Sequence, residues 1–284
     1  MKLSKIFALL LALCLISSAA CAATFTDAHG NVIELDDSLE AYAAVTLVGA
    51  DNAARQGETN LGDLWADALR WFAVSGEINA AFDEDDVKAG NDRIAVDADH
   101  VVALWNGGNL RADIAEGTFG AEALAEVLPF PNKVAVVYMT GAQLLETLEA
   151  ASQGLPYTAE TADACASLMQ VSGLTYTVDT TKAYDALEAY GDHWFTAGSV
   201  SRVRIDDVNG QKFDAEATYA VVTSNANFNG MDSSYVLKAA AEANEQSAVT
   251  TAVVRDVVFR FIAAELNHQV GEAYAAPQGR LTIL

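Results

Sequence analysis

The chain has 284 residues, of which 39 are Asp or Glu, 16 are Lys or Arg and 4 are His, giving a formal net charge of −23 at pH 7. This length fits one large domain or two small ones. So acidic a surface repels nucleic acid and anionic membranes, and we expect neither as a partner. A small anionic ligand can bind only where arginines are locally concentrated. The favoured interpretation of the negative charge is that it keeps the protein soluble.

The first 22 residues have the composition of a secretory signal peptide. Two lysines precede an apolar run over residues 6–16, and the small residues up to Ala22 fit a signal-peptidase site. The apolar run is too short to span a membrane. A lipoprotein modified at Cys21 is the less favoured alternative, because Ser18 stands where a leucine is wanted. We therefore expect a secreted, periplasmic or cell-envelope protein.

Cys165 is the single cysteine beyond that peptide. No disulfide can therefore form within the mature chain, and a zinc site built from cysteines is excluded. Residues 23–48 predict an extended N-terminal extension, with two short strands on either side of residues 29–31. We expect the main domain to span residues 49–284.

The first part of that domain predicts one long helix and a polar surface excursion. Apolar side chains recur at helical spacing over residues 58–73, and Thr59 or Asn60 can cap this helix. The acidic stretch 79–100 suits solvated surface better than calcium binding, because its spacing does not match an EF-hand loop.

Strands and helices interleave over the rest of the chain without a regular βαβ rhythm. The clearest helix is predicted over 140–154, where Thr140 and Gln143 form a capping box, and Asn209-Gly210 is a strong hairpin-turn signal. The other expected helices cover 120–130, 233–244 and 250–268, and the expected strands cover 100–105, 133–139, 169–179, 199–207, 218–225 and 279–284. This arrangement predicts an α+β domain with a mixed β-sheet flanked by helices.

Six segments occur in an order that resembles one known family. They are ETNLGDLWADAL (58–69), NGGNLRADIAEG (106–117), EVLPFPNKVAVVYMTGAQLLETLE (126–149), QVSGLTYTVD (170–179), NGQKFDAEATYAVVTSN (209–225) and PQGRLTIL (277–284). Together they resemble the C-terminal domain of the 5'-nucleotidases, including the UDP-sugar hydrolases, over residues 49–284. The resemblance implies a domain that binds the nucleoside part of a substrate, whereas an N-terminal metallophosphoesterase domain with two metal ions performs the hydrolysis.

The sequence lacks the metal-ligand motifs of that catalytic domain. A two-metal centre needs about six or more His, Asp and Asn ligands, but the chain has 4 histidines and contains neither G-N-H-E nor H-x-H. The D-x-H at 27–29 stands alone and is favoured as surface. We therefore expect no cofactor in this chain and no hydrolysis by it alone. A two-metal site would have to come from a partner.

The loop NGGNLR supplies the first predicted ligand residues. Asn106 and Arg111 fall on the family motif N-G-G-x-I-R, with Leu110 in place of isoleucine. The resemblance implies that this Asn lies near the nucleoside and this Arg near phosphate or ribose, and Arg55 matches a second arginine of the family. The alternatives are that Asn106 satisfies backbone groups at the turn and that Arg111 forms a surface salt bridge.

The aromatic clamp that the family closes on the base is incomplete in this sequence. Phe130 matches the first aromatic of the clamp, but Ala226 stands where the second is expected. Phe228 lies two residues later, and we include it among the candidate substrate-binding residues because it could swing in to replace the missing ring. The resemblance implies that Asp232 hydrogen-bonds ribose hydroxyls. The alternatives are a Phe130 packed in the core and an Asp232 that caps a helix.

Two hypotheses about function follow from these residues. The first is the nucleotide-binding half of a nucleotide hydrolase, in which Asn106, Arg111 and Phe130 face one cleft and a small anionic nucleotide-like ligand binds there. A separate metallophosphoesterase chain would then perform the hydrolysis. The alternative is a non-catalytic binding or scaffold protein of the cell envelope. Neither hypothesis involves a transmembrane span.

Overall fold

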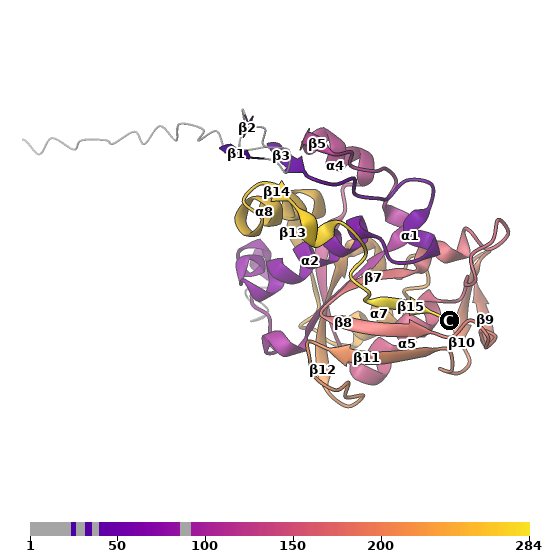
Figure 1. Cartoon of the computed structure of the whole chain (residues 1–284). Coiled ribbons are helices and arrows are strands. Elements are labelled where there is room, and N and C mark those ends of the chain that lie inside the picture. The colour runs from indigo at the N-terminus through magenta and orange to yellow at the C-terminus, as the bar shows by residue number, and fades with distance from the viewer. Residues whose placement is uncertain (1–23, 27–31, 36–39, 86–91) are drawn as a thin grey trace, which may run out of the picture. The chain divides into compact units, whose positions relative to one another are not determined.

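The computed structural model describes residues 24–26, 32–35, 40–85 and 92–284 (Figure 1). The chain divides into two units, Met1–Ser38 and Leu39–Leu284. In the first unit, β1 (Thr24–Thr26) and β2 (Val32–Glu34) form the antiparallel pair that the sequence predicts. The predicted signal peptide and the D-x-H at 27–29 lie outside the described residues.

A five-stranded mixed sheet forms the centre of the second unit. Its strands run in the order β13-β6-β12-β4-β7. β4 and β12 are parallel, and the other neighbouring pairs are antiparallel. The strands are β4 (Val101–Asn106), β6 (Lys133–Thr140), β7 (Met169–Ser172), β12 (Thr218–Ser224) and β13 (Ala248–Val253). With the helices that flank it, this sheet confirms the expected α+β class.

Both faces of the sheet are covered, which explains the long apolar runs in its strands. Val101, Ala103 and Trp105 of β4 join one buried cluster, and Val102 and Leu104 join the other. The first cluster includes α2 (Asn60–Val74) and α8 (Val254–Glu265), and the second includes α5 (Gly141–Ala151) and α7 (Tyr235–Ala243). Burial on both faces fixes the register of β4, and so fixes where its last residue emerges.

Smaller sheets and short helices surround this centre (Figure 1). One sheet has the order β11-β8-β15, another the order β14-β3-β5, and β9 pairs with β10. The strands are β3 (Glu40–Ala43), β5 (Gly117–Gly120), β8 (Leu174–Val178), β9 (Ala186–Tyr190), β10 (Trp194–Ala197), β11 (Val203–Val208), β14 (Gln269–Val270) and β15 (Leu281–Ile283). The short helices are α1 (Ala53–Gln56), α4 (Ala121–Val127) and α6 (Asn225–Phe228), with 3₁₀ turns η1 (Glu77–Ala81), η2 (Ala98–His100), η3 (Gly107–Asn109), η4 (Ala164–Ser167) and η5 (Glu272–Tyr274). In the described part of the chain, no helix has the length and apolarity needed to cross a membrane.

The helix starts and the tight turn follow the predicted signals. The Thr59 side chain accepts a backbone N–H of the first turn of α2 at 3.0 Å, and Thr140 and Gln143 form the expected capping box of α5. Asn209 and Gly210 have φ angles of 50° and 77°, as a two-residue hairpin turn of the predicted kind requires.

Several segments differ from the predicted elements. The strand expected over 169–179 is broken at Gly173 into β7 and β8, which belong to different sheets. The helix expected over 250–268 begins only at Val254, because residues 248–253 form β13 and pair with β6 at the edge of the sheet. The β-branched residues of that segment favour a strand. Residues 186–197, for which no strand is predicted, form the β9–β10 hairpin. β9 is almost wholly exposed, so it carries no alternating apolar pattern.

Candidate functional site

The predicted ligand loop begins where β4 ends, and its glycines allow a close packing of backbone on backbone. Gly107 lies against α1, so that a Cβ atom placed on it would come within 1.9 Å of the Ala54 carbonyl oxygen. A Cβ atom on Gly108 would come within 2.6 Å of the Ala166 Cβ atom. The loop therefore needs both glycines to reach its position between α1 and η4.

Asn106 joins this loop to the loop that carries Asp232. Asn106 is fully buried, and its Nδ2 donates to Asp232 Oδ2 at 2.6 Å, across 126 positions of sequence. Its Oδ1 accepts from Asn109 Nδ2 at 2.8 Å. Asp232 has a φ angle of 50°, in the left-handed region. Such a conformation costs energy in a residue other than glycine, and the bond from Asn106 helps to hold it.

Asp232 does not cap the following helix, since the N-cap position of α7 is Ser234. This finding removes the alternative role that the sequence left open for Asp232. One oxygen of its carboxylate faces Asn106, which leaves the other oxygen, Oδ1, as an acceptor for a further donor.

Two arginines flank the Asn106–Asp232 bridge. Arg55 on α1 is buried, and its Nη1 donates to the Ala162 carbonyl oxygen at 2.9 Å. The same nitrogen lies 3.7 Å from a carboxylate oxygen of Asp163, which is largely exposed. Arg111, in contrast, is exposed, and within the described part of the chain it forms no ion pair. Arg111 therefore has more unpaired N–H donors than Arg55.

The guanidinium of Arg111 lies over the ring of Phe130, 5.7 Å from the ring centre. Phe130 follows α4 and is 41% exposed, so it does not belong to the core, which was the alternative for it. The backbone N–H of Arg111 donates to the Val127 carbonyl oxygen at 2.9 Å, and this bond holds the two segments together. An exposed ring beneath an arginine is a surface on which a flat ligand can stack.

The charges of this site act on one another. Burial raises the pKa of the Asp232 carboxyl, and the positive charges of Arg55 and Arg111 oppose that rise. Burial also lowers the pKa of Arg111, with Arg55 adding to the effect and Asp232 opposing it. The two guanidinium groups and the carboxylate therefore interact electrostatically, although the three residues come from distant segments of the sequence.

Phe228 has a different surrounding from the other predicted residues. It ends α6 and packs, half-buried, against the apolar cluster that includes Leu237 of α7. Its side chain therefore contributes to the core at this point. Ala226, at the position expected for the second clamp aromatic, is half-exposed on the same short helix.

Residues that the sequence did not single out support the Asp232 loop. Gln153, just after α5, donates from Nε2 to Ser233 Oγ at 2.6 Å and accepts the Phe195 N–H at 3.0 Å. Tyr190 of β9 lies near this loop, where burial, together with the charge of Asp232, raises the pKa of Tyr190 to about 12. Single polar residues after a helix or in an exposed hairpin give no motif, so no sequence signal pointed to them.

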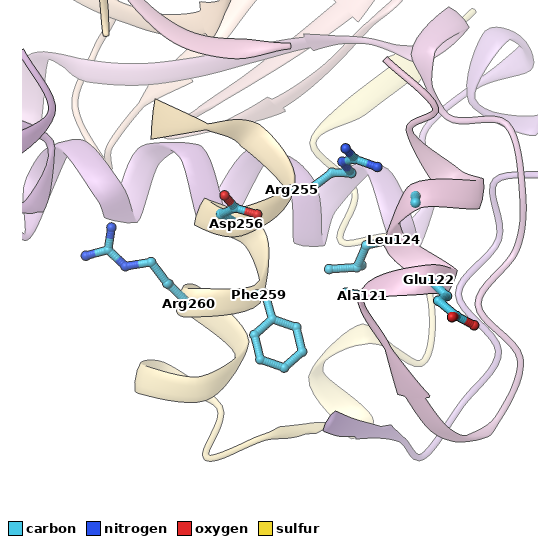
Figure 2. A pocket seen from close by; sticks show the side chains of 8 residues that line it. Ala121, Glu122, Leu124, Arg255, Asp256, Phe259 and Arg260 are labelled. Atoms are coloured by element: carbon cyan, nitrogen blue, oxygen red, sulfur yellow. The ribbon is translucent and has the colours of Figure 1, made fainter. Parts of the chain in front are cut away.

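A hollow of about 470 Å³ lies between α4 and α8, and none of the predicted site residues lines it. Figure 2 shows Leu124 of α4 and Phe259 of α8 pointing into this hollow, with Arg255 and Arg260 along α8. Among the described residues there is also no group of three or more His, Cys, Asp or Glu side chains that could hold a metal ion.

Comparisons with known proteins agree with this fold. The family model described as "5'-nucleotidase, C-terminal domain" matches residues 40–239. The trifunctional nucleotide phosphoesterase YfkN of Bacillus subtilis is 29% identical over 188 residues, which cover 65% of this chain and 10% of that protein.

Solved structures show the same similarity. The 5'-nucleotidase precursor of Thermus thermophilus matches with a TM-score of 0.61 and 28% identity, over 86% of this chain and 39% of that one. The NAD nucleotidase of Haemophilus influenzae matches with a TM-score of 0.57 over 92% of this chain and 48% of that one, and its 14% identity indicates a shared fold only. The chain thus spans less than half the length of each of these relatives. The match of the family model over most of the chain identifies it as a member of the 5'-nucleotidase C-terminal domain family.

Proposed function

We propose that this chain is an exported nucleotide-binding protein that supplies the substrate-binding half of a nucleotide hydrolase. The observation that carries the proposal is the bridge from Asn106 to Asp232, whose carboxylate feels the charges of Arg55 and Arg111, with the Arg111 guanidinium over an exposed Phe130. Each of these residue types suits one part of a nucleotide. The names of the similar proteins, a nucleotide phosphoesterase and nucleotidases, support the same ligand class.

The proposed roles follow from the free groups of each residue. Asp232 accepts a ribose hydroxyl on its Oδ1, since its other oxygen is taken by Asn106. Arg111 binds the phosphate by charge-assisted hydrogen bonds, because its donors face no carboxylate partner in the described residues. Phe130 stacks on the base, and Arg111 must then move off the ring or remain at its edge.

Hydrolysis itself is assigned to a separate metallophosphoesterase chain. The described residues do not fit a two-metal centre, because they hold no cluster of three or more metal-ligating side chains. The chain spans less than half of the length of the matched nucleotidases. In this proposal, the partner chain supplies the metal ions and the activated water.

The alternative is a non-catalytic binding or scaffold protein of the cell envelope. Two observations favour it: the face of Phe130 is covered by the Arg111 guanidinium, and Ala226 offers no second ring. In that case the loops keep the family geometry without a nucleotide ligand.

Titration calorimetry of the mature chain with UMP, uridine and UDP-glucose separates the two proposals. With one stacking face in place of two, we expect UMP to bind with a dissociation constant on the order of 100 µM. Loss of a charge-assisted hydrogen bond in Arg111→Ala should weaken UMP binding by about tenfold or more. The control is Arg204→Ala, which removes another exposed positive charge, on β11.

An affinity for UMP that is unchanged in Arg111→Ala, or equally changed in both variants, contradicts the proposed site. No detectable binding of any of the three ligands favours the scaffold alternative.

A further inference from the structure

Two acidic side chains at the start of α2 hold the end of the chain in place. Glu58 lies just before the helix and Asp63 in its first turn, where Asp63 is fully buried. The terminal segment, residues 277–284, passes over both. The N–H of Gln278 donates to Asp63 Oδ2 at 3.0 Å, and the N–H of Leu281 donates to Glu58 Oε2 at 3.0 Å. Each carboxyl group thus uses one oxygen to bind the terminal segment.

The second oxygen of each group has no donor. Glu58 Oε1 and Asp63 Oδ1 are both shielded from solvent, and neither receives a hydrogen bond in the described part of the chain. The charge of Glu58 and its hydrogen-bonding group both raise the pKa of Asp63, so the two carboxyl groups are neighbours. Two carboxylate oxygens cannot hydrogen-bond unless one of them carries a proton. A single proton between them would satisfy both buried atoms at once.

The charged neighbours leave room for one such proton. Arg280 of the terminal segment donates to Asp67 Oδ2 at 2.8 Å and lies 3.8 Å from Asp63 Oδ1. Arg70 on α2 interacts electrostatically with Asp67, and its guanidinium donates hydrogen bonds to the carbonyl oxygens of residues 98 and 101. Asp99 acts on Arg70 as well, so Arg280 is the positive charge that acts on Asp63, and it also pairs with Asp67. One positive charge does not neutralise both carboxylates, so the charges around Asp63 are compatible with a proton on the pair.

Two tyrosines complete the surroundings, and neither serves as the missing donor. The Tyr274 hydroxyl on η5 donates to Asp67 Oδ2 at 2.9 Å, and the Tyr176 hydroxyl on β8 donates to the Met169 carbonyl oxygen at 2.6 Å. Both hydroxyl protons are thus engaged elsewhere. The proton between the carboxyl groups has to be a separate one.

We propose that Glu58 and Asp63 form a carboxyl pair that shares one proton, and that this proton fastens the terminal segment to the domain. When the proton is lost, the fully buried charge of Asp63 and the neighbouring charge of the half-buried Glu58 repel one another, and the backbone bonds from Gln278 and Leu281 loosen. β15 then separates from β8, with which it pairs in parallel. The terminal segment is in this sense a pH-sensitive strap, independent of nucleotide binding.

The pKa of Asp63 agrees with a proton shared by the two carboxyl groups. Burial raises the pKa of Asp63 to about 8, with Glu58 adding to the rise and Arg280 and the Gln278 N–H opposing it. In the unfolded chain the same group has a pKa of about 3.9. The folded state therefore holds a proton that the unfolded state has released. Its contribution to stability is complete below the unfolded pKa and is lost as the pH rises towards 8 and above.

Hydrogen exchange of the full mature chain, corrected for the intrinsic pH dependence of exchange, tests the proposal. The protection of the backbone amides of residues 281–283 should fall by about tenfold or more between about pH 6 and about pH 9. In Asp63→Asn the amide can donate to Glu58 Oε1 while its carbonyl accepts the Gln278 N–H. Protection should then persist up to pH 9. Glu58→Gln offers the mirror arrangement and should behave alike, whereas the exposed Asp256→Asn should keep the wild-type pH step.

Several results would overturn the carboxyl pair. One is a wild-type protection that does not change over this pH range. Another is an Asp63→Asn or Glu58→Gln chain, folded by circular dichroism, that keeps the wild-type pH step. A loss of protection caused by a chelator at about pH 6 would mean that a cation, and not a proton, joins the two carboxyl groups. If one variant fails to fold, the other decides.

Discussion

Replacing Glu149 by glutamine should destabilise the domain strongly, because its carboxylate is a buried acceptor for a whole loop. Glu149 is fully buried near the end of α5. It accepts the backbone N–H groups of Ser201 at 3.2 Å, Arg202 at 2.9 Å and Val203 at 2.9 Å. The Arg202 side chain is buried too, and its guanidinium donates to the carbonyl oxygens of Ser152 at 3.0 Å and Leu155 at 2.7 Å.

The size of the effect follows from the acceptors that are lost. Oε2 of Glu149 accepts from all three N–H groups and Oε1 also accepts from Arg202, whereas the amide of glutamine has one acceptor oxygen with two lone pairs and one NH₂ group. Glutamine thus leaves at least one N–H without an acceptor and removes the negative charge that offsets Arg202. A hydrogen bond to a charged group contributes about 1.5–3 kcal/mol, and a buried polar group left without a partner costs about 1–3 kcal/mol. We expect a loss of about 3 kcal/mol out of a total of about 5–15 kcal/mol.

Urea unfolding at neutral pH, followed by circular dichroism, measures this loss. The midpoint should fall without a change in the slope of the transition. Glu122→Gln is the matched control, since Glu122 is exposed on α4 and should lose less than about 0.5 kcal/mol. A Glu149→Gln domain that loses less than about 1 kcal/mol would refute the reasoning, because unsatisfied buried groups cost more than that.

Two further predictions concern the ligand loop and the clamp. Gly107→Ala should cost about 3 kcal/mol or more in urea unfolding, because the new Cβ would meet the Ala54 carbonyl oxygen, whereas Gly57→Ala, with open space around it, should cost less than 1 kcal/mol by the same measurement. Ala226→Phe should tighten UMP binding about tenfold in calorimetry by restoring a stacking face, and Ala226→Leu, which adds bulk without a ring, should not.

The parts of the fold that could be predicted are those with strong local signals. β4, β6 and β12 are apolar along almost their whole length because both faces of the sheet are buried. The helical spacing of apolar residues and the N-caps at Thr59 and Thr140 predict α2 and α5. In each case the local preference and the tertiary packing favour the same structure.

The missed elements lack such agreement. β9 has no buried face, so the alternation that marks a strand is absent from residues 186–190. β13 runs without a break into α8, and the apolar residues of both segments read as one helical pattern from 250 to 268. The β-branched residues of β13 favour a strand, but the boundary is fixed by the pairing of β13 with β6, which is a property of the fold rather than of the segment.

The candidate site shows the same limit. The resemblance to the family selected Asn106 and Asp232 from distant motifs, but it did not imply the direct hydrogen bond between them. Nor did it imply that Phe228 packs in the core, or that Gln153 braces the neighbouring Ser233. The proposed ligand roles themselves stay predictions until binding is measured.

The contact between Arg111 and Phe130 decides how that measurement is interpreted. A cation over an exposed ring contributes about 0.5–1 kcal/mol, whereas a base stacked on an aromatic side chain contributes about 1–3 kcal/mol. A base can therefore displace the guanidinium with a net gain. Removing Arg111 then has two opposite effects: it uncovers the ring, and it deletes a phosphate ligand worth about 1.5–3 kcal/mol. Uridine should bind Arg111→Ala as well as the wild type or slightly better, while UMP binds it less well. If uridine and UMP lose affinity alike, Arg111 supports the loop rather than the phosphate.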